Sequence, residues 1–214
     1  PDGVVNDRWG VPYHGFLTRE YTDIPDIIDH PWESTRGLGF SFGYNQSEDA
    51  RHSLSGDALV RLLIDVVAKN GNLLLSIPMR GDGTIDAEEE RILDGITAWM
   101  QRNGAAIHGS RPWRIYGEGP TQVRAGMHTE GDALFRPDDV RFTVTGAVLN
   151  TVLLDWPTAP VPIAALGSTA LPATRIGRIT LSDGRPVTFR RMAHALEVTL
   201  PPAGAADMIP VLRI

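Results

Sequence analysis

Two stretches in the first half of the chain carry apolar residues at helical spacing. In residues 57–69 and 86–102 these positions are Leu59, Leu62, Leu63, Val66 and Val67, then Ile92, Leu93, Ile96, Trp99 and Met100. Positions three and four apart share one face of a helix, so both stretches are predicted helices with one buried face. SLSGD precedes the first as a cap, and Asp86 with Glu89 forms a capping box at the start of the second.

Between the predicted helices lies GNLLLSIP, a short apolar run bounded by Gly71 and Pro78. Such a run is typical of a strand buried on both faces of a parallel sheet that helices cover. RGLGFSF, residues 36–42, is a second predicted strand because two glycines argue against a helix, and VVND predicts the end of another. One or two βα units do not close a parallel sheet, so the first half is predicted to be part of a larger α/β domain.

The pattern changes to alternating apolar and polar residues near residue 115. VRFTVTG and ALEVTLP alternate in this way, RITLSDGRPVTFR has a hairpin signal at Asp183-Gly184, and MIPVLRI ends the chain as a last strand. Short strands separated by prolines favour an antiparallel sandwich. The predicted division is therefore residues 1–116, of α/β type, and residues 117–214, of β type.

The segment from Val4 to Pro25 is rich in polar residues, shows little periodicity and is predicted to be a loop. Glu20 in this segment follows aromatic Phe16 and precedes Tyr21, and Glu33 directly follows Trp32. A carboxyl beside apolar rings loses solvation, which raises its pKa and suits it to general-acid work.

Arg8 can form two parallel hydrogen bonds to a carboxylate or to sugar hydroxyls. A solvated surface glutamate and a structural ion pair of the arginine are the competing interpretations. Residue types alone therefore indicate a polar cleft.

Composition excludes several classes of protein. The chain is 42% hydrophobic and 21% charged, with a formal net charge of −6 and a pI near 5.5, which gives no electrostatic footprint for nucleic acid. The absence of cysteine removes disulfides and thiolate metal sites, and no apolar run approaches the roughly 20 residues of a membrane span. The histidines lack metal spacing, and the glycines of MRGDGTI lack the Lys-Ser/Thr of a phosphate loop.

Five motifs in order carry a family resemblance: VVNDRWG, PWESTRGLGFSFGYN, LIDVVAKNGNLLL, GDGTI and NGAAIHGSRPW. Over about residues 3–116 they resemble the C-terminal part of α-L-fucosidases of glycoside hydrolase family 29. The resemblance implies the C-terminal part of a (β/α)₈-like barrel followed by an antiparallel β-sandwich. It also implies a retaining exo-hydrolase of terminal α-L-fucose, with an Asp nucleophile, a Glu acid/base, and neither metal nor organic cofactor.

Four residues take roles from this resemblance. The arginine of the family's NDRW falls on Arg8, where it would contact the sugar, and the acid/base of similar bacterial members falls on Glu20 in TREY. Glu33 in PWES is the rival acid/base, with a supporting ion pair or hydrogen bond as its alternative role. Phe42 in SFGYN falls where an aromatic ring lines the pocket for the fucose C6 methyl, and a plain core phenylalanine is the alternative.

The nucleophile of the family belongs to a strand-end motif that precedes VVNDRW. Pro1-Asp2-Gly3 lacks the aromatic context of that motif, has no starting Met or signal peptide, and predicts a chain whose beginning lies elsewhere. LLLSIPMRGDG also departs from the family's Asn-x-Gly-Pro, with Ser76 for Asn and Met79 for Pro. This chain alone is therefore predicted to be inactive.

The expected partners are a fucosylated oligosaccharide or glycoconjugate and the missing N-terminal barrel segment, with neither nucleic acid nor membrane. A non-catalytic sugar-binding or interaction module is an alternative, although Trp156 is the one obvious stacking aromatic of the predicted sandwich. A degenerate, inactive homologue is another. A homo-oligomer, the linkage specificity and the compartment (cytoplasm, periplasm or secretion) stay open.

Overall fold

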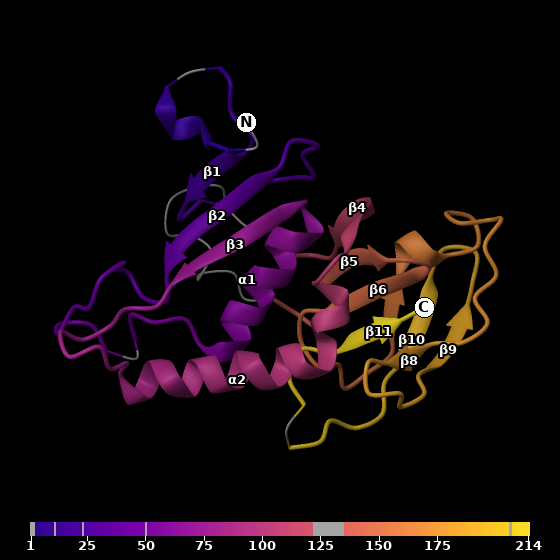
Figure 1. Cartoon of the computed structure of the whole chain (residues 1–214). Coiled ribbons are helices and arrows are strands. Elements are labelled where there is room, and N and C mark those ends of the chain that lie inside the picture. The colour runs from indigo at the N-terminus through magenta and orange to yellow at the C-terminus, as the bar shows by residue number, and fades with distance from the viewer. Residues whose placement is uncertain (1–2, 11, 23, 50, 122–134, 206) are drawn as a thin grey trace. The chain divides into compact units, whose positions relative to one another are not determined.

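The computed structural model describes residues 3–10, 12–22, 24–49, 51–121, 135–205 and 207–214 (Figure 1). The chain divides into two units, one made of residues 1–98 with 123–133 and the other of residues 99–122 with 134–214. Asp2, which the sequence analysis weighed as part of a nucleophile motif, lies outside the described residues. Within the described residues, no helix combines the length and the apolar character that crossing a membrane requires.

A sheet of three parallel strands organises the first unit. The strands are β1 (Leu17–Glu20), β2 (Trp32–Gly37) and β3 (Gly71–Ser76), in the order β1-β2-β3. Figure 1 shows them side by side, with helix α1 (Gly56–Ala68) running along them. The 3-10 helix η1 (Asp7–Trp9) precedes the sheet, and Asn6 just before it forms an isolated parallel bridge with Phe16.

Both helices begin where the sequence predicts. The side chain of Ser55 caps α1 by accepting a hydrogen bond from the Ala58 backbone N–H at 3.2 Å. Helix α2 (Ala87–Asn103) follows Asp86, whose backbone N–H donates to the Glu89 carboxylate at 3.3 Å, as in a capping box. The predicted helices at 57–69 and 86–102 are therefore confirmed to within one residue at each end.

The apolar face of the sheet packs against the two helices. One buried cluster centres on Trp32, Ile24 and Val66, and another on Leu38, Leu59 and Ile92. The strand residues that join these clusters are Leu17, Leu73 and Leu75. Because successive strand residues point to opposite faces, these three and Trp32 define the face of the sheet that the helices cover.

The other face of the sheet carries Thr18, Glu20, Glu33, Thr35, Asn72 and Leu74, and we call it the polar face. Leu74 is 51% exposed there, although it lies in the middle of β3. The prediction that GNLLLSIP is buried on both faces was therefore wrong for this strand. Both clusters packed by the helices lie on the first face, and Asn72 and Leu74 on the polar face are exposed.

Two strand predictions in this unit need correction. The strand expected at residues 36–42 is β2, which begins at Trp32 and ends at Gly37, so residues 38–42 form the loop that follows it. The segment predicted as a loop contains β1, and Glu20 is the last residue of that strand. Only Leu17 is apolar in β1, which explains why the strand shows no hydrophobic pattern in the sequence.

The second unit is a sandwich of two antiparallel sheets. The larger sheet has the order β4 (Arg111–Glu118), β5 (Val140–Thr145), β6 (Val148–Leu153), β11 (Val211–Arg213), β8 (Thr180–Leu181). The smaller has the order β7 (Val161–Ile163), β10 (Leu196–Thr199), β9 (Thr188–Arg191). Phe142, Leu153 and Leu196 belong to the buried core that both sheets share. Two 3-10 helices, η2 (Gly104–Ala106) and η4 (Ala164–Leu166), complete the unit.

The predicted strands of the second half are present, and the turn between two of them has a different role. The backbone N–H of Gly184 donates to the Leu181 carbonyl at 2.9 Å, and Gly184 has a φ of 90°, which glycine adopts readily. The turn is confirmed, but β8 and β9 on its two sides belong to different sheets. Strand β4 pairs with β5 and spans the expected boundary at 116/117, which stays a prediction.

Candidate active site

Arg8 and Glu20 form an ion pair on the polar face of the sheet. Nη2 of Arg8 lies 2.7 Å from Oε2 of Glu20, and Nε of the same guanidinium donates to the Thr18 hydroxyl at 2.9 Å. Thr18 and Glu20 are two residues apart on β1, so they present their side chains on one face. The Arg8 guanidinium therefore lies over that face and reaches from Thr18 to Glu20 at the end of β1.

Asp7 holds η1 against β1 beneath this pair. Its Oδ1 accepts hydrogen bonds from both the backbone N–H and the hydroxyl of Thr18 at 2.8 Å, and its Oδ2 contacts Nη1 of Arg19 at 3.3 Å. Burial by itself would raise the pKa of Asp7, but the hydrogen bonds from Thr18 and Arg19 outweigh it and hold that pKa below its ordinary value. The ionised carboxylate thus fixes the neighbouring Arg8 backbone on the sheet.

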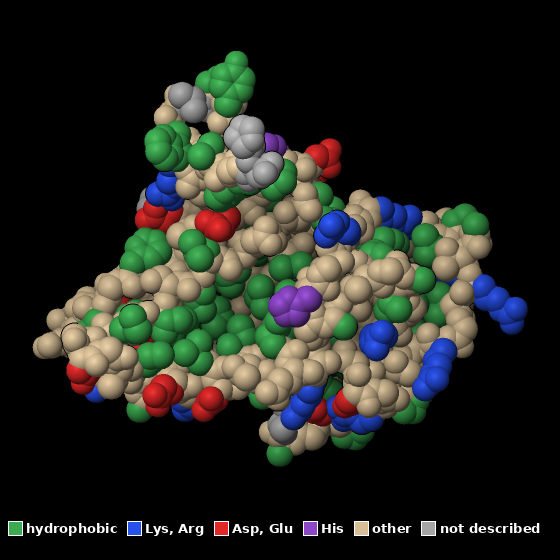
Figure 2. Space-filling model, in the orientation of Figure 1, with side chains coloured by type: hydrophobic (Ala, Val, Ile, Leu, Met, Phe, Trp, Pro, Cys, Tyr) green, Lys and Arg blue, Asp and Glu red, His purple; other side chains and the backbone are tan. Residues whose placement is uncertain are grey.

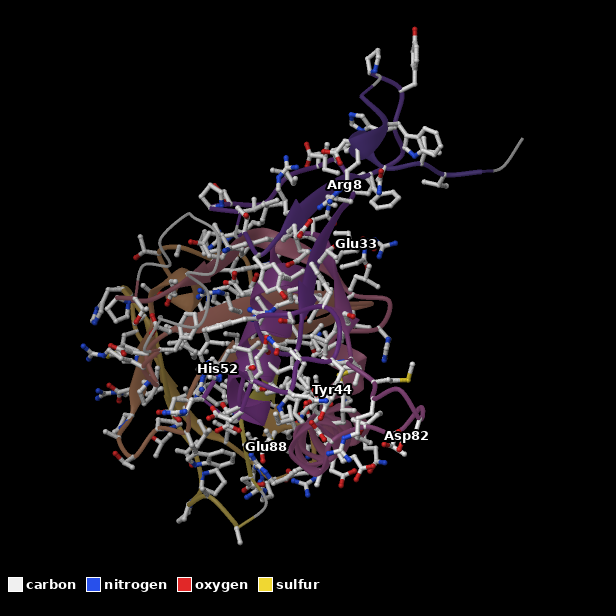
Figure 3. All side chains as sticks on the ribbon, turned by 90° about the vertical axis from the view of Figure 1, so that its left-hand side faces the viewer. Arg8, Glu33, Tyr44, His52, Asp82 and Glu88 are labelled. Carbon is white, nitrogen blue, oxygen red and sulfur yellow. The ribbon has the colours of Figure 1, made fainter. Side chains whose placement is uncertain are left out.

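Glu20 and Glu33 lie on the same face at different heights along the strands. In the parallel register Glu20 is opposite Thr35, whereas Glu33 is opposite Thr18. Glu33 is the second residue of β2 and accepts a hydrogen bond from the Thr35 hydroxyl at 3.2 Å. Glu20 is therefore two residues, or about 6.6 Å, nearer the carboxyl edge of the sheet. Figure 3 labels Arg8 and Glu33 in the same part of the first unit.

Phe42 lies in the loop that follows β2 and is 39% exposed, so it is not a plain core side chain. Its backbone carbonyl accepts a hydrogen bond from the Ser76 hydroxyl, at the end of β3, at 3.1 Å. Its ring meets the ring of Tyr21 edge-on, with centroids 5.3 Å apart. Tyr21 directly follows Glu20, so Phe42 contacts the residue that comes next after the end of β1.

Sequence reasoning missed Tyr21 as part of this arrangement. The side chain is buried, and its hydroxyl contacts the backbone of the loop after β2. Ser76, weighed in the sequence analysis only as a departure from the family motif, ties the same loop to β3. The signal available for Tyr21 was its place directly after a candidate acid/base, which says nothing about where its side chain lies.

A small hollow of about 60 Å³ lies among the loops that follow β2 and β3. Its lining includes the carboxylates Glu48, Asp86 and Glu89, and Arg80 pairs with Asp86 beside it. Burial raises the pKa of Glu89, and the nearby charges of Asp86 and Glu48 add to this effect. Figure 3 labels Tyr44 and Glu88, which also line this hollow. Within the described residues, no group of three or more His, Cys, Asp or Glu side chains has an arrangement that could hold a metal.

Trp156 in the second unit is not an open stacking surface. Its ring lies 5.5 Å from the Arg185 guanidinium, and its indole N–H donates to the Pro201 carbonyl at 3.3 Å. The side chain also packs against the buried core of the sandwich. The one obvious stacking aromatic of the predicted sandwich is therefore engaged by neighbours within its own unit.

The fold and the site define an α/β unit with a charged pair at the carboxyl ends of parallel strands, joined in one chain to a β-sandwich. Residues 1–105 match the family model described as alpha-L-fucosidase. The chain is 30% identical to human tissue α-L-fucosidase over 161 residues, which are 72% of this chain and 31% of that protein.

Solved structures of α-L-fucosidases are similar over the whole chain. One covers 100% of it with a TM-score of 0.79 and 34% identity, and the Thermotoga maritima enzyme covers 99% with a TM-score of 0.76 and 34% identity. Through its matching segment, the chain belongs to the α-L-fucosidase family. The chain spans 45% of the length of each of these two structures.

Proposed function

We propose that this chain supplies the acid/base side of the active site of a retaining exo-α-L-fucosidase. Glu20 is the acid/base, Arg8 contacts the sugar, and Phe42 lines the pocket for the C6 methyl of fucose. The three-stranded sheet of the first unit is part of a (β/α)₈-like barrel. The nucleophile Asp comes from a segment outside this chain.

The observation that carries the proposal is the Arg8–Glu20 pair on the polar face, at the carboxyl end of β1. Barrel enzymes place catalytic groups at the carboxyl ends of their strands, whereas residues lower in the barrel serve stability. Glu20 ends its strand, and Glu33 comes near the start of its own. This difference in height supports Glu20 over Glu33 as the acid/base and leaves Glu33 a supporting role through Thr35.

The proposed chemistry is a double displacement. In the first step the protonated carboxyl of Glu20 donates its proton to the glycosidic oxygen as the bond to the anomeric carbon breaks and the Asp nucleophile attacks. In the second step the Glu20 carboxylate accepts a proton from water, whose oxygen displaces the Asp. Arg8 contacts Glu20 when no sugar is bound, and a sugar hydroxyl competes for the same guanidinium donors.

The expected macromolecular partner is the barrel segment that carries the nucleophile. All the large hydrophobic side chains recorded as exposed among the described residues belong to the first 79 positions; they are Val4, Val5, Trp9, Tyr13, Phe40, Phe42, Leu74 and Met79. Figure 2 shows hydrophobic side chains on the loop around η1. Parallel sheets in α/β proteins are covered on both faces. A complementary barrel segment would cover Leu74 on the polar face and complete the carboxylate pair.

The test uses an aryl α-L-fucoside. The purified chain alone is expected to release no aryl alcohol. Co-expressed with the preceding barrel segment of a related α-L-fucosidase, it is expected to release the alcohol with retention at the anomeric carbon. The matched control is the same segment with its nucleophile Asp replaced by Asn. Turnover by the chain alone would contradict the placement of the nucleophile, and turnover insensitive to Glu20→Gln would contradict the acid/base assignment.

A further inference from the structure

Tyr21 has a backbone conformation that its side chain disfavours. Its φ is 46°, in the left-handed region, and it is neither a glycine nor one of the small polar residues that adopt this region readily. The side chain is only 3% exposed. A strained conformation persists where the surroundings impose it, and such residues concentrate at functional sites. Here the residue directly follows Glu20, and its own backbone N–H donates to the Thr35 carbonyl at 3.1 Å.

The hydroxyl of Tyr21 lies at the start of the loop that carries Phe42. It accepts a hydrogen bond from the Gly37 backbone N–H at 2.8 Å and lies 3.2 Å from the carbonyl oxygens of both Gly39 and Phe40. One hydroxyl proton serves these two carbonyls, so the group satisfies both its donor and its acceptor capacity. A side chain at position 37 would collide first with the Ser41 backbone carbonyl and then with this hydroxyl, which explains the glycine there.

The ring of Tyr21 contacts the same loop a second time, through Phe42. The two rings meet edge-on at 5.3 Å, and the Arg36 guanidinium lies 5.2 Å from the centre of the Tyr21 ring. Edge-on aromatic pairs and cations over rings both depend on geometry, so each contact restricts where the ring can lie. Tyr21 therefore holds the loop at its start with the hydroxyl and at Phe42 with the ring.

Glu48 holds the opposite side of the loop. Its carboxylate accepts hydrogen bonds from the Phe40 backbone N–H at 3.2 Å, from the Ser41 hydroxyl, and from the Asn45 side-chain amide at 3.2 Å. Phe40 is thus bound through its carbonyl by Tyr21 and through its N–H by Glu48. These hydrogen bonds hold Phe40 from two sides, so the start of the loop after β2 has a defined position relative to β1.

We propose that Tyr21 is a positioning residue: its hydroxyl and ring set the distance between the carboxylate of Glu20 and the ring of Phe42. This inference rests on the proposed function, in which those two groups act on one sugar. Glu20 and Tyr21 share a peptide bond, so a shift of the Tyr21 ring moves the backbone that carries the acid/base. Misplacing a catalytic group by about 1 Å costs an enzyme up to about a hundredfold in rate.

The first measurement needs no activity. Tyr21→Phe removes the hydroxyl and keeps the ring, and hydrogen exchange of the Gly37 amide is followed by NMR in the full chain. We expect that amide to exchange about fivefold faster or more, because it loses its acceptor. The amide of Leu38, which donates to the Ser76 carbonyl at 3.0 Å, serves as the internal reference. Tyr116→Phe, in the second unit, is the matched control for loss of a tyrosine hydroxyl.

The second measurement uses the chain complemented by the nucleophile segment. Tyr21→Phe is expected to lower kcat/KM about tenfold or more on fucosides with poor leaving groups and severalfold less on activated aryl fucosides, since only the former need protonation. A structural defect alone would lower both equally. Equal losses, or an unchanged Gly37 amide, would overturn the positioning role while wild-type turnover upholds the proposed function. A complemented wild type without turnover would instead overturn the proposed function and this inference together.

Discussion

The Arg8 guanidinium meets the Glu20 carboxylate at 2.7 Å, and the two residues come from different elements, η1 and the last position of β1. The side chains are 51% and 36% exposed. Exposed ion pairs contribute about 0–1 kcal/mol to stability, so the Arg8–Glu20 pair adds little to the stability of the fold. Either residue should therefore be replaceable without unfolding the chain, which makes the pair suitable for functional tests.

Replacing Glu20 by glutamine should remove the proposed proton donor and keep the size of the side chain. In the complemented enzyme we expect Glu20→Gln to reduce kcat/KM about 10²- to 10⁴-fold on fucosides with poor leaving groups. Activated aryl fucosides should lose much less in the first step, since their leaving groups need little protonation. The measurement is a series of aryl fucosides of graded leaving-group acidity.

Glu33→Gln is the matched control for this series. Glu33 lies on the same polar face and bonds to Thr35, so its replacement changes local packing by a similar amount. We expect a loss that does not depend on the leaving group. If Glu33→Gln produced the dependence on leaving group and Glu20→Gln did not, the roles of the two carboxylates would be exchanged.

The helices and the sandwich strands were predictable because their patterns are local. Both helices carry apolar residues at helical spacing and cap signals, and β5 and β10 alternate regularly. Strand β1 was not predicted because LTRE has only one apolar residue. Hydrogen bonds to β2 and to Asp7 hold the strand in position. Such contacts depend on tertiary structure and leave no local pattern in the sequence.

The candidate site was likewise predictable only where a local motif marked its residues. Arg8, Glu20 and Phe42 came from motifs, whereas the ion pair between Arg8 and Glu20 and the height of Glu20 above Glu33 depend on strand register. Tyr21 was missed because its role rests on a left-handed backbone and on contacts with residues 16–21 positions away. Sequence spacing does not encode which side of a strand end a side chain takes after such a turn.

Truncation of two adjacent leucines of β3 should change the free energy of unfolding of the first unit by very different amounts. Leu73 packs in both helix-facing clusters, and Leu74 is 51% exposed on the polar face. Leu73→Ala should lower the free energy of unfolding of the first unit by about 2–3 kcal/mol, because it leaves a cavity. Leu74→Ala should change it by less than about 0.5 kcal/mol. Urea unfolding of both variants measures this difference.

The same pair tests the proposed covering of the polar face. Leu74→Ala should weaken complementation by the barrel segment, measured as the concentration of segment that restores half of the turnover. Leu73→Ala should leave that concentration unchanged once the fraction of folded chain is accounted for. Equal destabilisation of the isolated chain by both variants would show that the polar face is already packed within the chain.

Lys69 is the only lysine of the chain and should report unfolding of the first unit. Its side chain is 2% exposed, and its Nζ lies 2.6 Å from the Asp65 carboxylate, itself buried. We expect acetic anhydride at neutral pH to leave Lys69 unmodified in the folded chain and to acetylate it fully in denaturant. Mass spectrometry of a proteolytic digest distinguishes this site from the N-terminal amine.

An exposed lysine provides the control for this experiment. Arg91 is 67% exposed on α2, so Arg91→Lys introduces an accessible amine into the same unit. That lysine should be acetylated within the first time point in the folded chain. Equal rates at positions 69 and 91 would contradict the buried ion pair of Asp65 and Lys69.

Asp7 should make the first unit sensitive to acid. Its folded pKa lies below the ordinary value of 3.8, because hydrogen bonds from Thr18 and Arg19 outweigh burial. A carboxylate with a lowered pKa stabilises the fold above its unfolded pKa, and this contribution is lost as the pH falls through the folded pKa. Asp7→Asn should therefore lower the thermal midpoint at pH 7, and the difference from wild type should shrink as the pH falls below 3.8.

Thermal unfolding between pH 7 and pH 2.5, followed by circular dichroism, measures this convergence. Asp29→Asn corrects for the change in net charge, since it removes an exposed carboxylate without touching Thr18 or Arg19. A difference between wild type and Asp7→Asn that stays constant down to pH 2.5 would contradict the role of the ionised carboxylate. Convergence would instead show that the ionised Asp7 holds η1 on β1, and with it the guanidinium of Arg8 over Glu20.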